Sequence, residues 1–246
     1  MSNFDAKVVK DNIVKWIQDW FEQNGKGCNA VVGISGGLDS SVVASLCVEA
    51  LGKERVYGVL MPQNTQSDIG DSYDLCKALD IKYCVIDIGS TVDSLLNLVW
   101  LRTGIEKVSS QTSINLPPRI RMSTLYAVSQ SMNGRVMNTS NLSESYVGYD
   151  TRFGDSVGDC SPLANLTKTE IRAIGMELGL PEQFVNKTPA DGLCGQTDED
   201  RFGFTYEVLD KYIRTGICEN EEIKNKIDTM HEKNLFKLQP IPSFKL

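Results

Sequence analysis

The stretch Ser35-Gly36-Gly37-Leu38-Asp39-Ser40-Ser41 decides how this chain folds. An apolar run over residues 30–34, rich in β-branched side chains, precedes it and predicts a buried parallel strand. A second apolar run over residues 42–51 follows it and predicts a helix packed against the sheet. A strand, a glycine-rich turn and a helix N-terminus leave free backbone N–H groups and the positive end of a helix dipole at the turn. The stretch therefore predicts a phosphate-binding site.

Asp39 distinguishes this turn from a Walker A loop, in which Gly-Lys-Ser or Gly-Lys-Thr follows the glycines. Its carboxylate would repel phosphate unless a divalent cation lay between them. A simple helix cap would also use Asp or Ser. A cap needs one such residue, however, and six of these seven positions are Gly, Ser or Asp. The pattern favours a phosphate site that includes a metal ion.

Strands and helices alternate outward from this turn. Further elements are expected as strands over residues 55–61, 83–88 and 135–139, and as helices over 67–79, 119–131 and 170–178. Alternation at this spacing is typical of right-handed βαβ units. We therefore expect one domain over residues 1–246, with an α/β fold built on a doubly wound, mainly parallel sheet with helices on both faces. Ligands of such sheets bind at the carboxyl ends of the strands, where the turn lies.

Composition narrows the class of protein. The 246 residues are 41% hydrophobic and 23% charged, which suits one well-cored domain. The net charge of −7 argues against a nucleic-acid binder, which would normally be basic. The chain shows neither an apolar run of about eighteen residues nor a signal peptide, so we expect no membrane association. Seven cysteines without a Cys-x-x-Cys pair indicate reduced thiols and a cytoplasmic location.

Two other segments indicate ligand binding. Pro117-Pro118 is expected to end any preceding helix, which would put Arg119 and Arg121 in the first turn of the next one. Cations there oppose the helix dipole, so an anionic ligand is a better explanation than two solvated side chains. Residues 187–203 show little periodicity, and an unstructured stretch of that length predicts a functional loop. We expect this loop to close over the site.

Several motifs resemble those of known enzymes. Ser35-Gly36-Gly37-Leu38-Asp39-Ser40 after a buried strand is similar to the pyrophosphate loop of the N-type ATP pyrophosphatases, which have the adenine nucleotide alpha hydrolase-like fold. Within that superfamily the chain resembles the NAD synthetase family. The matching motifs are Asn115 to Met122, Thr139 to Glu144, Gly158-Asp159, Leu166-Thr167-Lys168, Lys187-Thr188-Pro189 and Asp198 to Gly203.

This resemblance implies an ammonia-dependent NAD⁺ synthetase, a carbon–nitrogen ligase. Such an enzyme uses ATP to amidate deamido-NAD⁺ with ammonia through an NAD-adenylate, and releases NAD⁺, AMP and pyrophosphate. Ammonia is the expected nitrogen source because the sequence shows no stretch that resembles a glutaminase domain. The resemblance also implies Mg²⁺ and a homodimer. One histidine, His231, makes a Ser-His or Cys-His hydrolase improbable.

The resemblance also implies roles for individual residues. It implies that Asp39, Glu144 and Lys168 are catalytic, and that Asp39 and Glu144 hold the metal. The implied contacts to ATP are Gly33, Ser35, Gly36, Gly37, Asp39, Ser40, Thr139 and Lys168. The implied contacts to deamido-NAD⁺ are Arg119, Arg152, Asp159 and Lys237.

The sequence departs from the family pattern at three places. Arg152 stands where lysine is commoner, Ala190 where threonine is usual, and Phe236-Lys237-Leu238 where His-Lys-Arg is common. Two other functions stay open: another adenylating amide or thiol transferase of the superfamily, and a non-enzymatic ATP sensor. A sensor would not need Glu144, Arg119 and Lys168 together with Asp39.

Overall fold

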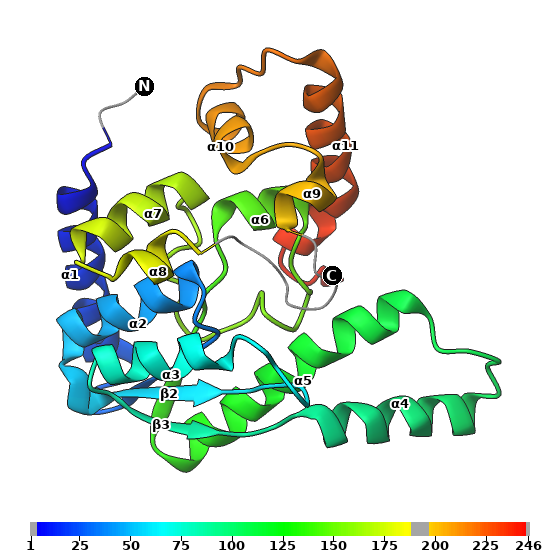
Figure 1. The fold of residues 1–246 in the computed structure, drawn as a ribbon, viewed down its shortest axis with the longest axis horizontal. Helices are drawn as coiled ribbons and strands as arrows, with labels where there is room; N and C mark the ends of the chain where they lie inside the picture. Colours follow the sequence, from blue (N-terminus) through cyan, green and yellow to red (C-terminus); the bar gives the residue numbers. More distant parts are fainter. Residues whose placement is uncertain (1–3, 188–196, 245–246) are drawn as a thin grey trace.

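The computed structural model of the chain describes residues 4–187 and 197–244. Its centre is a parallel four-stranded sheet with the order β3-β2-β1-β4 (Figure 1). The strands are β1 (Asn29–Gly33), β2 (Val56–Leu60), β3 (Lys82–Val85) and β4 (Gly134–Met137). Each lies within two to three residues of its expected position, and the expected doubly wound α/β fold is confirmed.

Helices cover both faces of the sheet. One face packs against α1 (Ala6–Asn24), α2 (Leu38–Leu51), α3 (Ile69–Ala78), α7 (Lys168–Glu177) and α8 (Glu182–Val185). The other face packs against α4 (Gly89–Thr103) and α5 (Ser110–Ser131). β1 is the central strand, and Ala30, Val31 and Val32 are fully buried because side chains on both of its faces meet a core. A strand buried on both faces explains why this stretch reads as a continuous apolar run.

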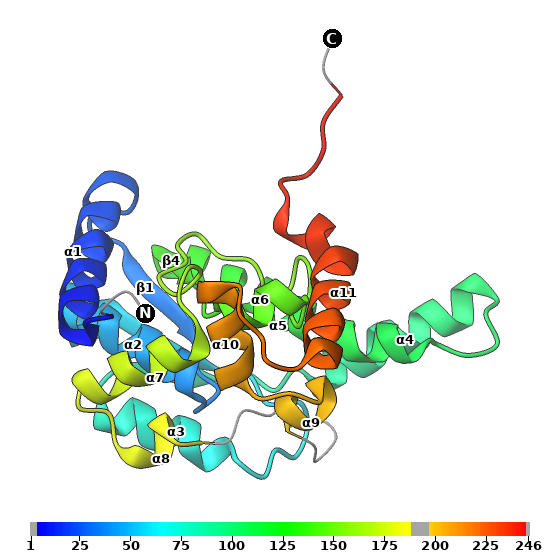
Figure 2. The same cartoon turned by 90° about the horizontal axis from the view of Figure 1, so that it is seen from above.

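A third group of helices stands beyond the end of the sheet. It comprises α6 (Leu142–Val147), α9 (Asp198–Phe202), α10 (Tyr206–Thr215) and α11 (Glu221–Leu238), joined by a small aromatic core (Figures 1 and 2). None of the described helices is both long enough and apolar enough to span a membrane.

The structure corrects the expectation for α5. This helix runs from Ser110 through Pro117 and Pro118 without ending, so Arg119 and Arg121 lie in its middle rather than in a first turn. The two prolines lack a backbone N–H, so two helical hydrogen bonds are missing. Burial of Pro117 in the core keeps the segment helical. The dipole argument for an anion at this helix start is therefore wrong.

The expectation of an irregular stretch over residues 187–203 is only partly correct. Its last residues form α9, which Thr197 caps by accepting a hydrogen bond from the Asp200 N–H. Residues 188–196, which include Ala190, lie outside the part that the structure describes. The closing loop therefore stays a prediction.

Candidate active site

The glycine-rich turn connects β1 to α2 and is closed by its own hydroxyl groups. The Oγ atoms of Ser35 and Ser40 are 3.0 Å apart, and the Gly37 N–H donates to Ser35 Oγ at 3.2 Å. α2 begins at Leu38, inside the motif and four residues earlier than expected. The motif therefore forms the first turn of the helix, where unpaired N–H groups are available to phosphate.

Gly36 allows α3 to approach this turn. Its φ is +71°, and a Cβ atom there would lie 2.6 Å from Asp71 Cβ and 2.8 Å from the Ser72 backbone nitrogen. Gly27 has nearly the same φ, +75°, but a Cβ atom there would meet nothing within 4 Å. The two glycines therefore separate the effect of backbone conformation from that of close packing.

We expect Gly36→Ala to lower the free energy of unfolding by about 3 kcal/mol and Gly27→Ala by about 1 kcal/mol. Both variants force a side chain into the left-handed region, but only Gly36→Ala pushes α3 away from the turn. Urea denaturation of the two variants measures the difference. Equal losses would mean that the approach of α3 has no energetic weight.

The ammonium group of Lys168 joins two carboxylates beside this turn. Its Nζ atom donates to Asp39 Oδ2 at 2.6 Å and to Glu144 Oε1 at 2.8 Å. The side chain of Lys168 is 4% exposed, and those of Asp39 and Glu144 are 18% and 19% exposed. We call these three residues the Lys168 triad. The structure brings together the three residues to which the sequence assigned catalysis.

Helix caps place each member of the triad. Asn141 caps α6 by accepting from the Glu144 N–H at 2.9 Å, and its Nδ2 donates to Asp39 Oδ1 at 3.1 Å. Asn141 thus joins the start of α6 to the start of α2. A capping box of Thr167 and Glu170 starts α7, so that Lys168 is its first residue.

Burial shapes the electrostatics of the triad. Burial raises the pKa of Asp39, while the Lys168 ammonium lowers it and the Glu144 carboxylate raises it. Burial by itself would lower the pKa of Lys168, but the two carboxylates outweigh it and raise this pKa well above its usual value. Lys168 is therefore held in its charged form at neutral pH, and two carboxylates share its charge.

Tyr206 and Asp198 extend the triad, although no role was predicted for either of them. The Tyr206 hydroxyl lies 3.0 Å from Asp198 Oδ2 and 3.3 Å from Glu144 Oε1. Asp198 is 5% exposed, and its Oδ1 atom has no hydrogen-bond partner among the described residues. Burial first, and Glu144 second, raise the pKa of Asp198. Its place in the family's acidic stretch was the only sequence signal for this residue.

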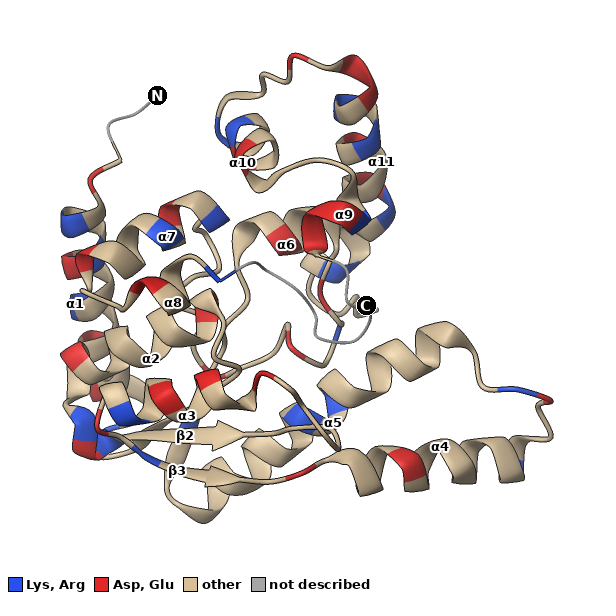
Figure 3. Cartoon of the chain, viewed as in Figure 1, with Lys and Arg blue, Asp and Glu red and all other residues tan. Residues whose placement is uncertain are grey.

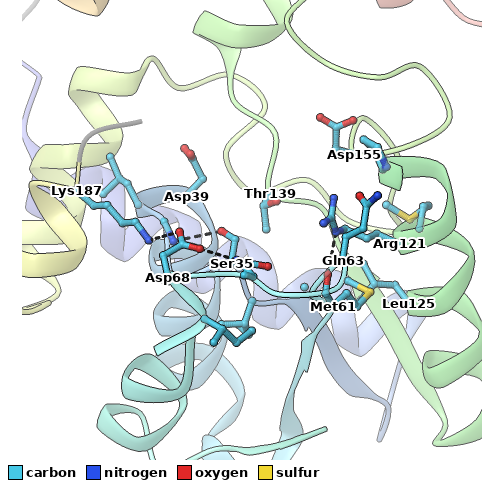
Figure 4. A pocket seen from close by; sticks show the side chains of 18 of the residues that line it. Ser35, Asp39, Met61, Gln63, Asp68, Arg121, Leu125, Thr139, Asp155 and Lys187 are labelled. Atoms are coloured by element: carbon cyan, nitrogen blue, oxygen red, sulfur yellow. Dashed lines mark hydrogen bonds and ion pairs between the residues drawn. The ribbon is translucent and has the colours of Figure 1, made fainter. Parts of the chain in front are cut away.

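A cavity of about 680 Å³ opens beside the triad at the carboxyl ends of the strands (Figure 4). Six of the eight residues expected to contact ATP line it, together with Glu144, which was expected to hold the metal: Gly33, Ser35, Gly37, Asp39, Thr139 and Lys168. The other two, Gly36 and Ser40, are not among the described residues that line the cavity. Gly36 packs on α3, and Ser40 is 4% exposed. The volume suits a nucleotide.

The opposite side of the cavity holds Arg121, which the sequence singled out for an anionic ligand, and Asp155, to which it assigned no role (Figure 4). Arg121 donates from Nε to the Met61 carbonyl oxygen at 3.0 Å. Burial lowers the pKa of Arg121, and it raises the pKa of Asp155 to about 6. Arg121 thus remains a candidate for an anionic ligand, on grounds of position rather than of helix dipole.

Lys187 lies on the cavity wall near the turn, between two carboxylates of α3 and its N-cap. Its Nζ atom is 2.9 Å from Asp68 Oδ2 (Figure 4). The same atom is 2.5 Å from Asp71 Oδ2. Together with Arg121 and Lys168, it is one of three cations that line the cavity in the described part of the chain.

The four residues expected to contact deamido-NAD⁺ are not among the described residues that line this cavity. Arg119 donates from Nε to the Arg152 carbonyl oxygen at 3.3 Å, so these two lie together. Asp159 instead accepts from the Val136 N–H at 2.8 Å and from the Tyr126 hydroxyl at 3.2 Å. The Lys237 ammonium donates to the carbonyl oxygens of Gly148 and Asp150.

Comparison with known proteins shows which family the chain resembles. The sequence profile of the NAD synthase family matches residues 9–244 of the chain. The NH₃-dependent NAD⁺ synthetase of Finegoldia magna is 39% identical over 243 residues, which is 98% of this chain and 96% of that protein.

Two solved structures resemble the whole chain. The NMN synthetase from Francisella tularensis has a TM-score of 0.90 at 30% identity. The match covers 99% of this chain and 100% of that one. The NH₃-dependent NAD synthetase from Campylobacter jejuni has a TM-score of 0.78 at 31% identity, with 98% of this chain and 99% of that one covered.

Proposed function

Because this chain belongs to the NAD synthase family, we propose that it amidates deamido-NAD⁺ with ammonia at the expense of ATP. The observation that carries this proposal is the Lys168 triad. The triad places a buried cation and two carboxylates beside the glycine-rich turn, next to a cavity large enough for a nucleotide. A carboxylate must be activated before ammonia can replace its oxygen, and adenylation supplies the leaving group.

In the first step, a carboxylate oxygen of the nicotinate ring attacks the α-phosphorus of ATP, and the bond to the bridging oxygen of pyrophosphate breaks. In the second step, ammonia adds to the acyl carbon, loses a proton and expels AMP. Neither step requires a nucleophile from the protein. The chain therefore contributes position and charge, with phosphates at the turn and Lys168 beside them.

The triad also suits Mg²⁺. Asp39 and Glu144 already converge on one cation, and Asp198 offers a buried oxygen without a partner among the described residues. No group of three or more His, Cys, Asp or Glu side chains in the described residues could hold a metal by itself. Mg²⁺ normally completes its shell with water and substrate phosphate. Asp39 and Glu144 would hold the ion, which would neutralise charge on the phosphates.

A second candidate substrate follows from the neighbour with the TM-score of 0.90, which is an NMN synthetase. Nicotinate mononucleotide carries the same carboxylate as deamido-NAD⁺ and lacks only the adenylyl half. Both substrates react at the same atom, so the triad and turn serve either equally. Side-by-side measurement of kcat/KM for the two acids decides which one the protein uses.

We expect ammonium to support turnover with ATP and Mg²⁺, with one AMP and one pyrophosphate formed for each amide. Glutamine at equal concentration should not replace it, because the F. magna relative, which matches 98% of this chain, is NH₃-dependent by name. Product analysis by chromatography is the measurement. Stoichiometric release of glutamate by the pure protein would contradict ammonia as the direct donor, and absence of any amide product would contradict the activity.

The proposal includes a homodimer. The hairpin of α4 and α5 projects from the body and carries few charged residues (Figures 1 and 3). Its exposed apolar side chains are Leu95, Leu98, Trp100, Leu101, Ile105 and Ile114. So many large apolar groups on one projection favour a protein partner, and the family favours a second copy of the chain.

We expect Leu101→Asp, at a side chain 64% exposed, to reduce the mass in solution to that of one chain without lowering the melting temperature. Light scattering after gel filtration measures the mass, and Ile217→Asp, at a site 57% exposed outside the hairpin, is the control. A dimer that survives Leu101→Asp would exclude the hairpin as the interface.

The proposal also includes a reducing compartment such as the cytoplasm. Four buried cysteines are free thiols, which suits such a compartment: Cys28, Cys47, Cys76 and Cys160.

A further inference from the structure

The side chain of Asn141 is fully buried at the start of α6 and makes two hydrogen bonds of opposite kinds. Its Oδ1 atom accepts from the Glu144 N–H at 2.9 Å, which caps the helix, and its Nδ2 atom donates to Asp39 Oδ1 at 3.1 Å. A backbone N–H can only donate, and an ionised carboxylate can only accept. The two partners therefore fix which way the Asn141 amide points.

The segment that carries Asn141 is itself held by neighbouring helices. Two residues further along, the Ser143 hydroxyl donates to Asp210 Oδ1 at 2.5 Å and accepts from the Lys168 N–H at 2.9 Å. Ser143 is fully buried, and Asp210 is 4% exposed. These bonds join the start of α6 to α10 and to the start of α7. Asn141 therefore projects from a fixed support, so its amide can fix the group to which it donates.

Asp39 is held at both of its carboxylate oxygens. Oδ2 accepts from the Lys168 ammonium, and Oδ1 accepts from Asn141. The Asp39 side chain is 18% exposed and lines the cavity, whereas Asn141 is not among the described residues that line it. Water from the cavity could solvate Oδ1 in place of Asn141, so folding does not require an amide at this position. What the amide adds is a fixed direction for the carboxylate.

The helix cap by itself does not explain an asparagine at position 141. Serine, threonine and aspartate also cap helices well. A serine hydroxyl ends where the amide carbon of Asn141 lies and so falls short of Asp39, and an aspartate would place a second carboxylate against it. An asparagine amide can accept from the helix N–H and donate to a carboxylate at the same time. The second bond therefore points to a role at Asp39.

We propose that Asn141 is a positioning residue that orients the Asp39 carboxylate toward the cavity for adenylation. It acts only through Asp39 and makes no contact with a substrate. A charged group that is fixed before the substrate arrives does not have to be reoriented in the transition state, which lowers the barrier. The inference rests on the proposed function for the reaction that Asp39 serves, but the contact between the two side chains does not depend on it.

The first test separates the cap from the donor. Asn141→Ser keeps a capping oxygen and removes the bond to Asp39. It should lower kcat for pyrophosphate release about five- to tenfold, leave KM for ammonium unchanged, and lower the melting temperature by no more than about 4 °C. Asn220→Ser is the matched control, because Asn220 caps α11 by accepting from the Glu222 N–H at 2.9 Å and is exposed. A wild-type kcat in Asn141→Ser, or an equal fall in both variants, would overturn the proposal.

The second test asks whether Asn141 acts through Asp39. In an Asp39→Ala background, Asn141→Ser should change the residual rate of pyrophosphate release by less than about twofold, because the carboxylate that it would orient is gone. A purely structural role for Asn141 would lower the rate by the same factor in both backgrounds. That outcome would contradict the proposal, since the lost donor would then act on some group other than Asp39.

Urea denaturation tests the same contact without a substrate. The shifts of the unfolding midpoint caused by Asn141→Ser and by Asp39→Ala should be less than additive in the double variant, because each substitution removes the same hydrogen bond. Additive shifts would show that the two side chains do not interact, and the proposal would fall. If the wild type shows no turnover, the proposed function fails, while this measurement still decides whether Asn141 holds Asp39.

Discussion

Lys168→Met is expected to lower the free energy of unfolding by about 3–5 kcal/mol, because it leaves two buried carboxylates without their shared cation. Lys168 is 4% exposed and bonds both Asp39 and Glu144, so water cannot replace it easily. Amidation turnover should fall about 10²- to 10³-fold, since a positive charge beside the phosphates is lost. Urea denaturation and steady-state kinetics measure the two effects.

The control for this variant removes one of the two negative charges as well. Lys168→Met with Glu144→Gln should recover at least about half of the lost stability, while activity stays low. Stability of the single variant should also increase toward acid pH. Burial already raises the pKa of Asp39 in the folded state, so protonation there favours the folded protein and this contribution is lost as the pH rises. An unchanged free energy of unfolding at neutral pH would show that the triad carries no structural weight.

Asp39→Asn should reduce pyrophosphate release by at least about 10²-fold while the fold stays intact. An amide oxygen can still accept from Asn141, and Lys168 keeps one carboxylate partner in Glu144, so the melting temperature should change little. The lost charge is the one that lies at the first turn of α2, where phosphate and a metal ion would meet. Glu144→Gln should behave in the same way, because the two carboxylates share one cation.

Asp74→Asn is the matched control, since it removes the same charge from an exposed position of α3 and should leave the rate unchanged. The measurement is pyrophosphate release at saturating Mg²⁺, together with a thermal melt of each variant. Release near the wild-type rate in Asp39→Asn would remove Asp39 from the proposed chemistry, and the same result in Glu144→Gln would remove Glu144.

Local signals in the sequence were sufficient for the architecture. The apolar run over residues 30–34, the glycine-rich turn and the helix after it appear as expected, because strand burial and turn chemistry depend on residues that are neighbours in the chain. Local rules failed at α5, where they placed a helix boundary at Pro117-Pro118. Packing of Pro117 into the core keeps this helix continuous, and no pattern of neighbouring residues reports that contact.

The site depends on contacts between distant segments. Lys168 meets Asp39 across 129 residues of chain, and Tyr206 meets Glu144 across 62. The sequence could name Asp39, Glu144 and Lys168 only through resemblance to a family, and it named no role for Tyr206. Lys237 was expected at the substrate, and its ammonium group bonds the carbonyl oxygens of Gly148 and Asp150. Its role as a substrate contact stays a prediction.

By itself the sequence determined the parallel α/β fold and the glycine-rich turn between β1 and α2. These follow from hydrophobic periodicity and from the backbone freedom of glycine, which act over a few residues. Only the tertiary structure decided that one buried ammonium joins two carboxylates, that Tyr206 and Asp198 extend this network, and that Lys237 bonds the carbonyl oxygens of Gly148 and Asp150. Such pairings arise when the helices pack, because burial makes each polar group take whatever partner the fold brings near.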